Sequence, residues 1–199
     1  MNFNTDVIIL SAGISKRMKY PKALLLYDSD TTFLEKIVNE YALFNCRRII
    51  VVLNDHNRKK IIPRLNKMVP ENVKFIINDH LEYERYYSVK TGLTGLDNPD
   101  FCFIQNIDNP FVNNILLSDI FRHRITEGYV SPRHNGRGGH PVLFGKAVIE
   151  NIRSTLKNDL NLRDVLASYS CKKIEVNNPE ILININTAEE YKKYFPGLS

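Results

Sequence analysis

The chain has 199 residues, of which 43% are hydrophobic and 25% charged, a composition typical of one globular domain and not of a disordered or collagen-like chain. We predict no membrane span, because no apolar run approaches ~18 residues, and no signal peptide at the N-terminus. The net charge of +5 favours anionic partners, but the basic residues do not form the aromatic-rich stripe of a nucleic-acid-binding protein. Three widely separated cysteines argue against a disulfide framework or a zinc knuckle and predict a reducing, cytoplasmic setting.

Short apolar, β-branched runs alternate with longer amphipathic segments over the first two-thirds of the chain. The predicted strands lie at residues 6–10, 48–53, 73–77 and 101–105. The predicted helices lie at residues 33–44, 58–68, 88–96 and 113–126. This alternation predicts crossover connections and a mainly parallel sheet with helices on both faces.

The last third of the chain has a different pattern. Residues 129–134 and 140–144 form two apolar runs around a glycine-rich turn, which predicts an antiparallel hairpin. We predict further helices at 146–156, 162–169 and 187–194, and strands at 172–176 and 181–185. No linker interrupts the chain, so the hairpin is expected to be a subdomain of one domain over residues 1–199.

The loop after the first predicted strand is the first candidate site, because open α/β sheets bind ligands beyond the carboxyl ends of their strands. It begins with the small residues Ser11, Ala12 and Gly13, whose backbone N–H groups can surround an anion. Arg17 and Lys22 follow as charged donors for phosphate oxygens. With Gly13 as its only glycine, the loop is neither a P-loop nor a dinucleotide-binding fingerprint, and an ordinary strand–helix connection is the alternative.

An aspartate, Asp108, follows the fourth predicted strand, at the same edge of the predicted sheet. Mg²⁺ commonly takes one or two protein carboxylates and completes its shell with phosphates and water, so one well-placed carboxylate suffices. The alternative is structural, because Asp108 and Asn109 can form an Asx turn before Pro110.

The order of residues in the first loop resembles a known signature, L-x-A-G-x-S-x-R-M-x-x-P-K-x-L-L. Its specified positions are matched by Leu10, Ala12, Gly13, Ser15, Arg17, Met18, Pro21, Lys22, Leu24 and Leu25. The chain thus resembles the MobA-like NTP transferase family, which activates phosphorylated acceptors with an NTP and includes molybdenum cofactor cytidylyltransferases. Together with the element order, the resemblance implies a three-layer α/β/α fold of Rossmann-like type, with a mostly parallel sheet and a small antiparallel hairpin subdomain. A donor half at about 1–112 and an acceptor half at about 113–199 are expected.

The resemblance assigns roles to the first loop and to the aspartate. Arg17 and Lys22 would bind the triphosphate and take part in catalysis, and residues 11–13 would contact base and phosphate through their backbone. The family motif G-D-x-P-[LF]-V is matched from Asp108 onward, with Ile107 where the glycine is usual. This match implies that Asp108 binds magnesium.

Further positions are carried over from the family. In the motif [DN]-I-[DN]-T-P-E-[DE], Asn186 matches a second metal ligand, and helix capping by Asn186 or Thr187 is the alternative. Asn78 and Ser88 flank a loop that lies beside the nucleotide base in the family, and Ser88 as a plain helix N-cap is the alternative. His140 falls in the R-G-x-P-V-L-F region beside the acceptor site, where a lone histidine is usually structural.

The resulting hypothesis is a Mg²⁺-dependent transfer of a nucleotide from an NTP to a phosphorylated acceptor, with release of pyrophosphate. CTP is the expected donor, because Ala12 stands where guanylyl-transferring relatives tend to have glycine. Molybdopterin is one candidate acceptor. A sugar, polyol or amino-alcohol phosphate is the alternative, because the chain keeps Asp159 and Arg163 of a G-D-x-G-A-R stretch but neither of its glycines.

A catalytically silent nucleotide-binding module is the further alternative to an enzyme. We expect neither a nucleic acid nor a membrane as partner, and the sequence leaves the oligomeric state open.

Overall fold

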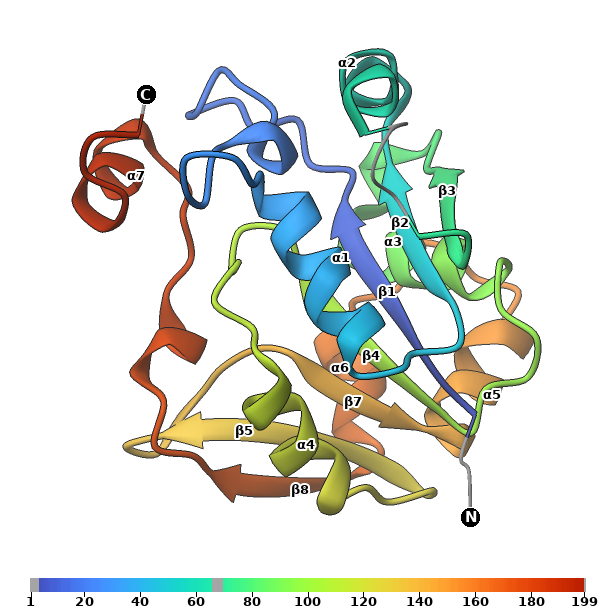
Figure 1. The fold of residues 1–199 in the computed structure, drawn as a ribbon. Coiled ribbons are helices and arrows are strands. Elements are labelled where there is room, and N and C mark those ends of the chain that lie inside the picture. The colour runs from blue at the N-terminus through green and yellow to red at the C-terminus, as the bar shows by residue number, and fades with distance from the viewer. Residues whose placement is uncertain (1–3, 66–69, 199) are drawn as a thin grey trace.

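The buried apolar run near the N-terminus forms β1 (Thr5–Ser11), which lies at the centre of the parallel part of the sheet (Figure 1). Its neighbours β2 (Ile49–Leu53) and β4 (Phe101–Asn106) pair with it in parallel, and β3 (Val73–Ile77) pairs with β2. The computed structural model describes residues 4–65 and 70–198, and within them these four predicted strands are confirmed. Apolar side chains point to both faces of these strands, as parallel strands covered on both sides require.

Beyond β4 the sheet continues with the predicted hairpin. The strand β7 (Val142–Gly145) pairs antiparallel with β4, and β5 (Gly128–His134) pairs antiparallel with β7 and with the short β6 (Arg137–Gly138). The last strand, β8 (Ser170–Glu175), pairs with β5 in parallel. The hairpin is therefore confirmed, and its strands continue the same eight-stranded sheet, in the order β3-β2-β1-β4-β7-β5-β6.

Helices connect these strands. They are α1 (Phe33–Leu43), α2 (Asp55–Leu65), α3 (Glu84–Leu93), α4 (Asn114–Arg122), α5 (Lys146–Ser154), α6 (Leu162–Ala167) and α7 (Ala188–Tyr194). Short 3-10 helices lie at η1 (Lys22–Leu24), η2 (Leu81–Tyr83) and η3 (Pro179–Leu182). Within residues 4–65 and 70–198, no helix combines the length and the hydropathy that crossing a membrane would require.

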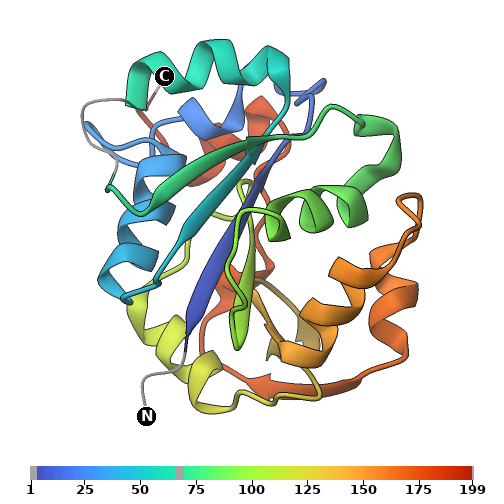
Figure 2. The same cartoon turned by 90° about the vertical axis from the view of Figure 1, so that its right-hand side faces the viewer.

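The alternation of side chains along β1 assigns the helices to two faces of the sheet. Val7 and Ile9 are buried together with residues of α1 and α4, whereas Ile8, on the opposite face, is buried with residues of α3 and α5. Figure 2 shows the sheet between α1 and α4 on one side (light blue and yellow-green) and α3, α5 and α6 on the other (green and orange). The three-layer α/β/α architecture is thereby confirmed.

Several helix boundaries differ from the prediction. The helix expected at 88–96 is α3, which begins at Glu84 because the buried side chain of Tyr86 extends its apolar face upstream. The helix expected at 58–68 is α2, which begins at Asp55, and its predicted end at Met68 lies outside the described residues. The helix expected at 113–126 is α4, which ends at Arg122.

One predicted strand is wrong. Residues 181–185 are not part of the sheet, because η3 is followed there by irregular chain. Their backbone carbonyl groups accept hydrogen bonds from the Asn109 side chain and from the His140 backbone N–H, and not from a neighbouring strand. The apolar run in this segment reflects burial of Ile181 and Ile185 in the hydrophobic core, and such burial is common to strands and irregular segments.

Candidate functional site

A cavity of about 370 Å³ lies beyond the carboxyl ends of β1 and β4. This is the edge at which the parallel topology predicts a ligand site, and in Figure 1 it lies at the top, where the arrowheads of β1 and β2 point. The predicted site residues on its lining are Ser11, Ala12, Gly13, Lys22, Asn78, Ser88 and Asp108.

Two asparagines hold the loop that follows β1. The Asn54 side-chain amide donates to the carbonyl of Ala12 (2.7 Å), and the Asn57 amide donates to the carbonyl of Gly13 (3.2 Å). Both asparagines are buried, and the backbone N–H of Asn57 in turn donates to Asn54 Oδ1 (2.7 Å). Because a trans peptide points its C=O and the following N–H in opposite directions, the N–H groups of Gly13 and Ile14 face away from the two asparagines.

Gly13 leaves room for a ligand at this loop. A Cβ atom placed on Gly13 would meet no atom within 4 Å, so the protein itself does not fill the space beside it. Backbone N–H groups that are fixed in direction and left uncovered are donors of the kind that bind phosphate.

Lys22, Asp108 and Asn186 converge from three distant parts of the chain. Lys22 follows Pro21 at the start of η1, and its Nζ donates to Asn186 Oδ1 at 2.7 Å and lies 3.4 Å from Asp108 Oδ2. The other carboxylate oxygen, Asp108 Oδ1, is buried and has no hydrogen-bond partner among the described residues. The Asp108 carboxylate and the Asn186 amide oxygen thus meet at Lys22, and carboxylate and amide oxygens are the kind of ligands that a hard cation takes.

The last helix is capped by Thr187 and not by the Asn186 side chain. Thr187 Oγ1 accepts from the backbone N–H of Glu190 (3.2 Å), and the Glu190 carboxylate accepts from the N–H groups of Asn186 and Thr187. This capping box satisfies the end of α7. It leaves the Asn186 side chain directed to Lys22, so of the two residues offered as caps only Thr187 is one.

Asn78 and Ser88 form a buried pair on the cavity lining. The Asn78 amide donates to Ser88 Oγ (2.9 Å), and Asn78 Oδ1 accepts from the backbone N–H of His80 (2.8 Å). Ser88 lies inside α3, where its hydroxyl donates to the carbonyl of Glu84 (3.3 Å). The interpretation of Ser88 as a helix N-cap is therefore wrong, because α3 begins one turn earlier.

His140 is half-buried and is not on the cavity lining. Its Nε2 accepts from the Asn106 side-chain amide (2.9 Å), and Asn106 lines the cavity. Burial, and to a lesser extent the positive charge of Arg85, lower the pKa of His140 to about 4, against the opposing effect of Asp108. The ring is thus neutral near pH 7, with Nδ1 buried and without a hydrogen-bond partner among residues 4–65 and 70–198.

Arg17 is not on the cavity lining. It is exposed on a turn that is closed by a hydrogen bond from the Lys19 N–H to the Ser15 carbonyl (2.9 Å), with both of these residues at positive φ. Ser15 itself lines the cavity. The structure therefore keeps Arg17 near the loop but brings it into contact with neither Lys22 nor Asp108.

Sequence reasoning missed several residues of the site: Asn54, Asn57, Glu84, Arg85 and Asn106. A signal existed for the first two, because they follow β2 at the same edge of the sheet as the first loop. Glu84 has a φ of 54°, a conformation that is rare for a glutamate, and no sequence pattern predicts this conformation.

A metal ion at this site would depend on its substrate for ligands. Nowhere in the described part of the chain do three or more His, Cys, Asp or Glu residues form a metal-binding group. Asp108 and Asn186 offer oxygen ligands only, and Mg²⁺ usually completes such a shell with phosphate oxygens and water. The residues present therefore fit a divalent cation that arrives with a nucleotide.

The chain matches a known protein family over most of its length. The family model for the MobA-like NTP transferase domain matches residues 7–174, which include the first loop and Asp108. The chain belongs to the MobA-like NTP transferase family. As a member of this nucleotidyltransferase family it is an enzyme, and the family commonly uses divalent metal ions.

Relatives within the MobA-like NTP transferase family transfer different nucleotides. The chain is 29% identical over 187 residues to a molybdenum cofactor cytidylyltransferase of Escherichia coli (strain K12), with 94% of this chain and 93% of that protein covered. It is 28% identical over 202 residues to a probable molybdenum cofactor guanylyltransferase of Bacillus mycoides (strain KBAB4), with 96% of each covered. Family membership alone therefore leaves the donor base open.

Solved structures share the fold across nearly the whole chain. Rv0371c from Mycobacterium tuberculosis H37Rv has a TM-score of 0.81 at 19% identity, with 98% of both chains covered. A structure of Rv0371C in complex with manganese has a TM-score of 0.74 at 18% identity, with 96% of this chain and 97% of that chain covered.

Proposed function

We propose that this nucleotidyltransferase moves CMP from CTP onto a phosphorylated acceptor and releases pyrophosphate. The observation that carries the proposal is the convergence of Lys22, Asp108 and Asn186 beside the cavity that the loop after β1 lines. A cation, an amide oxygen and a carboxylate meet there, and one oxygen of this carboxylate has no partner among the described residues. Transfer between phosphates needs little covalent chemistry from a protein, and these groups supply positioning and charge neutralisation.

The residues of the first loop would hold the donor triphosphate. The N–H groups of Gly13 and Ile14, directed away from Asn54 and Asn57, would donate to phosphate oxygens. Lys22 would neutralise the β- and γ-phosphates as a point charge. Arg17 would reach the outer phosphates from its exposed turn, with a forked set of donors.

Mg²⁺ is the cation that we assign to Asp108 and Asn186. Carboxylate and amide oxygens are suitable ligands for this ion. When bound, the ion would neutralise the charge that develops on the transferring and leaving phosphates. A phosphate monoester acceptor is already ionised near pH 7, so no residue of this chain needs to act as a general base.

We assign the base of the nucleotide to the part of the cavity near Ala12, Asn78 and Ser88. Ala12 is buried, and its methyl group narrows the space beside the backbone, which favours a pyrimidine. Backbone N–H and C=O groups of the loop would pair with the polar edge of cytosine, and a base lacking the amine would leave them unpaired. The cytidylyltransferase relative supports this choice, and the guanylyltransferase relative supports the competing one.

The acceptor would approach from the side of β7, with His140 as a contact. Molybdopterin is the acceptor favoured by the relatives. A sugar, polyol or amino-alcohol phosphate is the second candidate, because Asp159 and Arg163 are exposed and Asn161 between them caps α6 through the Arg163 N–H (2.8 Å). This arrangement lacks both glycines of the family's acceptor-side stretch. A silent nucleotide-binding module does not need a carboxylate at Asp108, one of whose oxygens has no partner in the described part of the chain.

The proposed division of labour follows the chain. The donor half would span about residues 1–112 and the acceptor half about residues 113–199, within one domain. We place the reaction in the cytoplasm, where NTPs are abundant and the three free cysteines stay reduced.

Pyrophosphate release tests this function. Each of the four NTPs is incubated with Mg²⁺ or with a chelator, in the presence of molybdopterin or of a panel of sugar, polyol and amino-alcohol phosphates. We expect release with CTP and Mg²⁺ and with one acceptor class only. Release with GTP alone would replace the proposed donor, and a nucleotide that stabilises the protein in thermal-shift titrations without turnover under any condition would favour the silent module.

A further inference from the structure

The segment between η3 and α7 carries Asn186 to the site although no strand pairing holds it. A single side chain replaces that pairing. The Asn109 amide nitrogen lies within hydrogen-bond distance of three carbonyl oxygens of the segment, those of Glu180 (3.0 Å), Ile181 (3.2 Å) and Ile183 (2.7 Å). Asn109 is only 1% exposed, so these bonds form away from water.

Asn109 is itself held, through its backbone carbonyl, by the end of β4. The Gln105 side-chain amide donates to the backbone carbonyls of Asn106 and Asn109, both at 2.8 Å. Gln105 Oε1 accepts from the hydroxyl of Tyr41 (3.0 Å), a buried residue of α1. The chain of bonds therefore runs from α1 through the end of β4 to the irregular segment, with each member held in one orientation.

The C-terminal end of the segment is bound to the backbone of Asp108. The backbone N–H of Ile185 donates to the backbone carbonyl of Asp108 (2.8 Å), next to Asn109 in sequence. On the other flank, the His140 N–H donates to the Ile181 carbonyl (3.1 Å), and a Cβ atom on Gly139 would lie 2.6 Å from Ile181. The segment thus has little freedom to shift between these contacts.

We propose that Asn109 is a positioning residue for the catalytic cluster: it fixes the segment 180–186 so that Asn186 Oδ1 lies beside Lys22 and Asp108. The proposal rests on the proposed function in treating that cluster as the catalytic site. Asn109 lies too deep to touch a substrate, and it acts through Asn186. An amide is needed because the three facing groups are all acceptors. An aspartate there would oppose them with a carboxylate, and an alanine would leave them without a donor.

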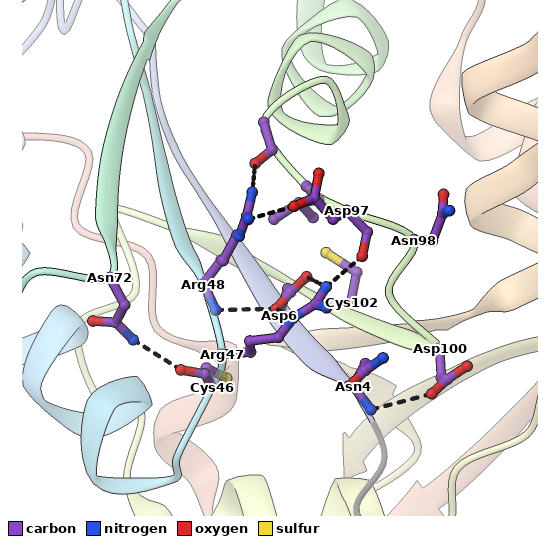
Figure 3. A network of polar contacts seen from close by, with 12 residues as sticks. Asn4, Asp6, Cys46, Arg47, Arg48, Asn72, Asp97, Asn98, Asp100 and Cys102 are labelled. Atoms are coloured by element: carbon purple, nitrogen blue, oxygen red, sulfur yellow. Dashed lines mark hydrogen bonds and ion pairs between the residues drawn. The ribbon is translucent and has the colours of Figure 1, made fainter.

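Hydrogen exchange tests the positioning without any assumption about activity. In Asn109→Ala, the Ile185 amide should exchange at least about tenfold faster than in the parent, because the segment loses its buried anchor. The matched control is Asn72→Ala, which removes a similar bond from an Asn amide to the backbone carbonyl of Cys46 (2.9 Å) at the other end of the sheet (Figure 3). This control should leave exchange at Ile185 unchanged.

Kinetics test the consequence for the site. Asn109→Ala should raise the Mg²⁺ concentration for half-maximal turnover about tenfold and lower kcat, with the KM for the NTP within about twofold of the parent. A purely structural role would lower the melting temperature but leave the Mg²⁺ dependence of the folded enzyme unchanged, as in Asn72→Ala.

A double-mutant cycle covers the case in which Asn109→Ala folds poorly. The milder Asn109→Ser is combined with Asn186→Ala, and the second change should abolish most of the effect of the first on Mg²⁺ dependence. Additive effects, or unchanged exchange at Ile185 in a folded Asn109 variant, would overturn the proposal. If the parent enzyme shows no turnover with any nucleotide, the proposed function fails, and the exchange result still decides the role of Asn109.

Discussion

An aspartate lies at each end of the parallel part of the sheet, and the two differ in how many hydrogen-bond donors surround the carboxylate. At the amino end, Asp6 of β1 is fully buried and accepts three hydrogen bonds, from the Arg48 backbone N–H (3.0 Å) and from Arg47 Nε (3.3 Å) and Nη2 (2.9 Å). Figure 3 shows these donors around the carboxylate. Arg47 Nη2 also donates to the backbone carbonyl of Asp97, so the network also fixes the turn before β4.

At the carboxyl end, Asp108 has a single charged neighbour, Lys22 Nζ at 3.4 Å, and its buried Oδ1 has no partner within the described residues. Asp6 lies on β1, and Asp108 directly follows the neighbouring strand β4. The two carboxylates differ in the number of fixed donors around them. A buried carboxylate whose oxygens are saturated serves the fold, and one that is left under-coordinated at a cavity is available for a ligand.

The largest effect should come from Asp108→Asn. We expect turnover with Mg²⁺ to fall at least 100-fold, because the loss of a metal's orienting and charge-stabilising roles costs about 3 kcal/mol or more of barrier. The melting temperature should change little, since the carboxylate contributes few bonds to the fold. Initial rates at saturating Mg²⁺ and calorimetric unfolding measure the two quantities. Near-parent activity in this variant would remove the metal assignment.

Asp6→Asn should lower the stability of the protein and leave its activity unchanged. Replacing the carboxylate leaves Arg47 without its charged partner, and we expect the free energy of unfolding to fall by about 2 kcal/mol. This value is smaller than for a fully buried pair because the Arg47 side chain is 37% exposed. The kcat of the folded fraction should match that of the parent. A selective loss of activity with unchanged denaturant midpoint would contradict the division between the two ends.

Lys22→Ala and Arg17→Ala, both at the carboxyl end of the sheet, should lower the affinity for NTP to different extents. Each contact between a charged side chain and a phosphate is worth about 1.5–3 kcal/mol, so loss of the partly buried Lys22 should lower NTP affinity about tenfold or more. The exposed Arg17 should cost less, because water competes for its partners. Titration calorimetry with NTP and with the nucleoside monophosphate measures both, with Lys60→Ala on the exposed face of α2 as control. Equal NTP binding in all three variants would show that this loop does not hold the triphosphate.

The smallest effect is the contribution of His140 to the pH dependence of the free energy of unfolding. Its pKa is lowered in the folded protein to about 4 from 6.5, so below pH 6.5 the unfolded chain takes up a proton that the native ring does not. Stability contributed by this group is therefore complete above pH 6.5 and is lost as the pH falls toward 4, by about 1 kcal/mol over the first pH unit. His140→Gln should flatten this part of the stability profile in urea unfolding. An identical slope in the parent and the variant would contradict the neutral, buried imidazole.

The sequence by itself determined the four parallel strands and one edge of the site. Apolar β-branched runs specified β1 to β4, and β3 (Val73–Ile77) has the predicted boundaries without change. Parallel strands bring their carboxyl ends to one edge, so the loop at Ser11 and the acid at Asp108 had to meet there. These inferences depend on local periodicity and chain direction, which are properties of neighbouring residues.

The tertiary structure alone decided the contacts made by single polar side chains over long sequence separations. Asn54 binds the carbonyl of Ala12, Asn106 binds His140, and Asn109 holds a segment more than 70 residues away. Such bonds leave no periodic pattern in the sequence. The apolar run 181–185 is therefore predicted as a strand, although the distant Asn109 amide donates to carbonyl groups of this segment. Saturation of Asp6 and under-coordination of Asp108 were likewise beyond the sequence, because the number of donors around an oxygen depends on where the whole chain places them.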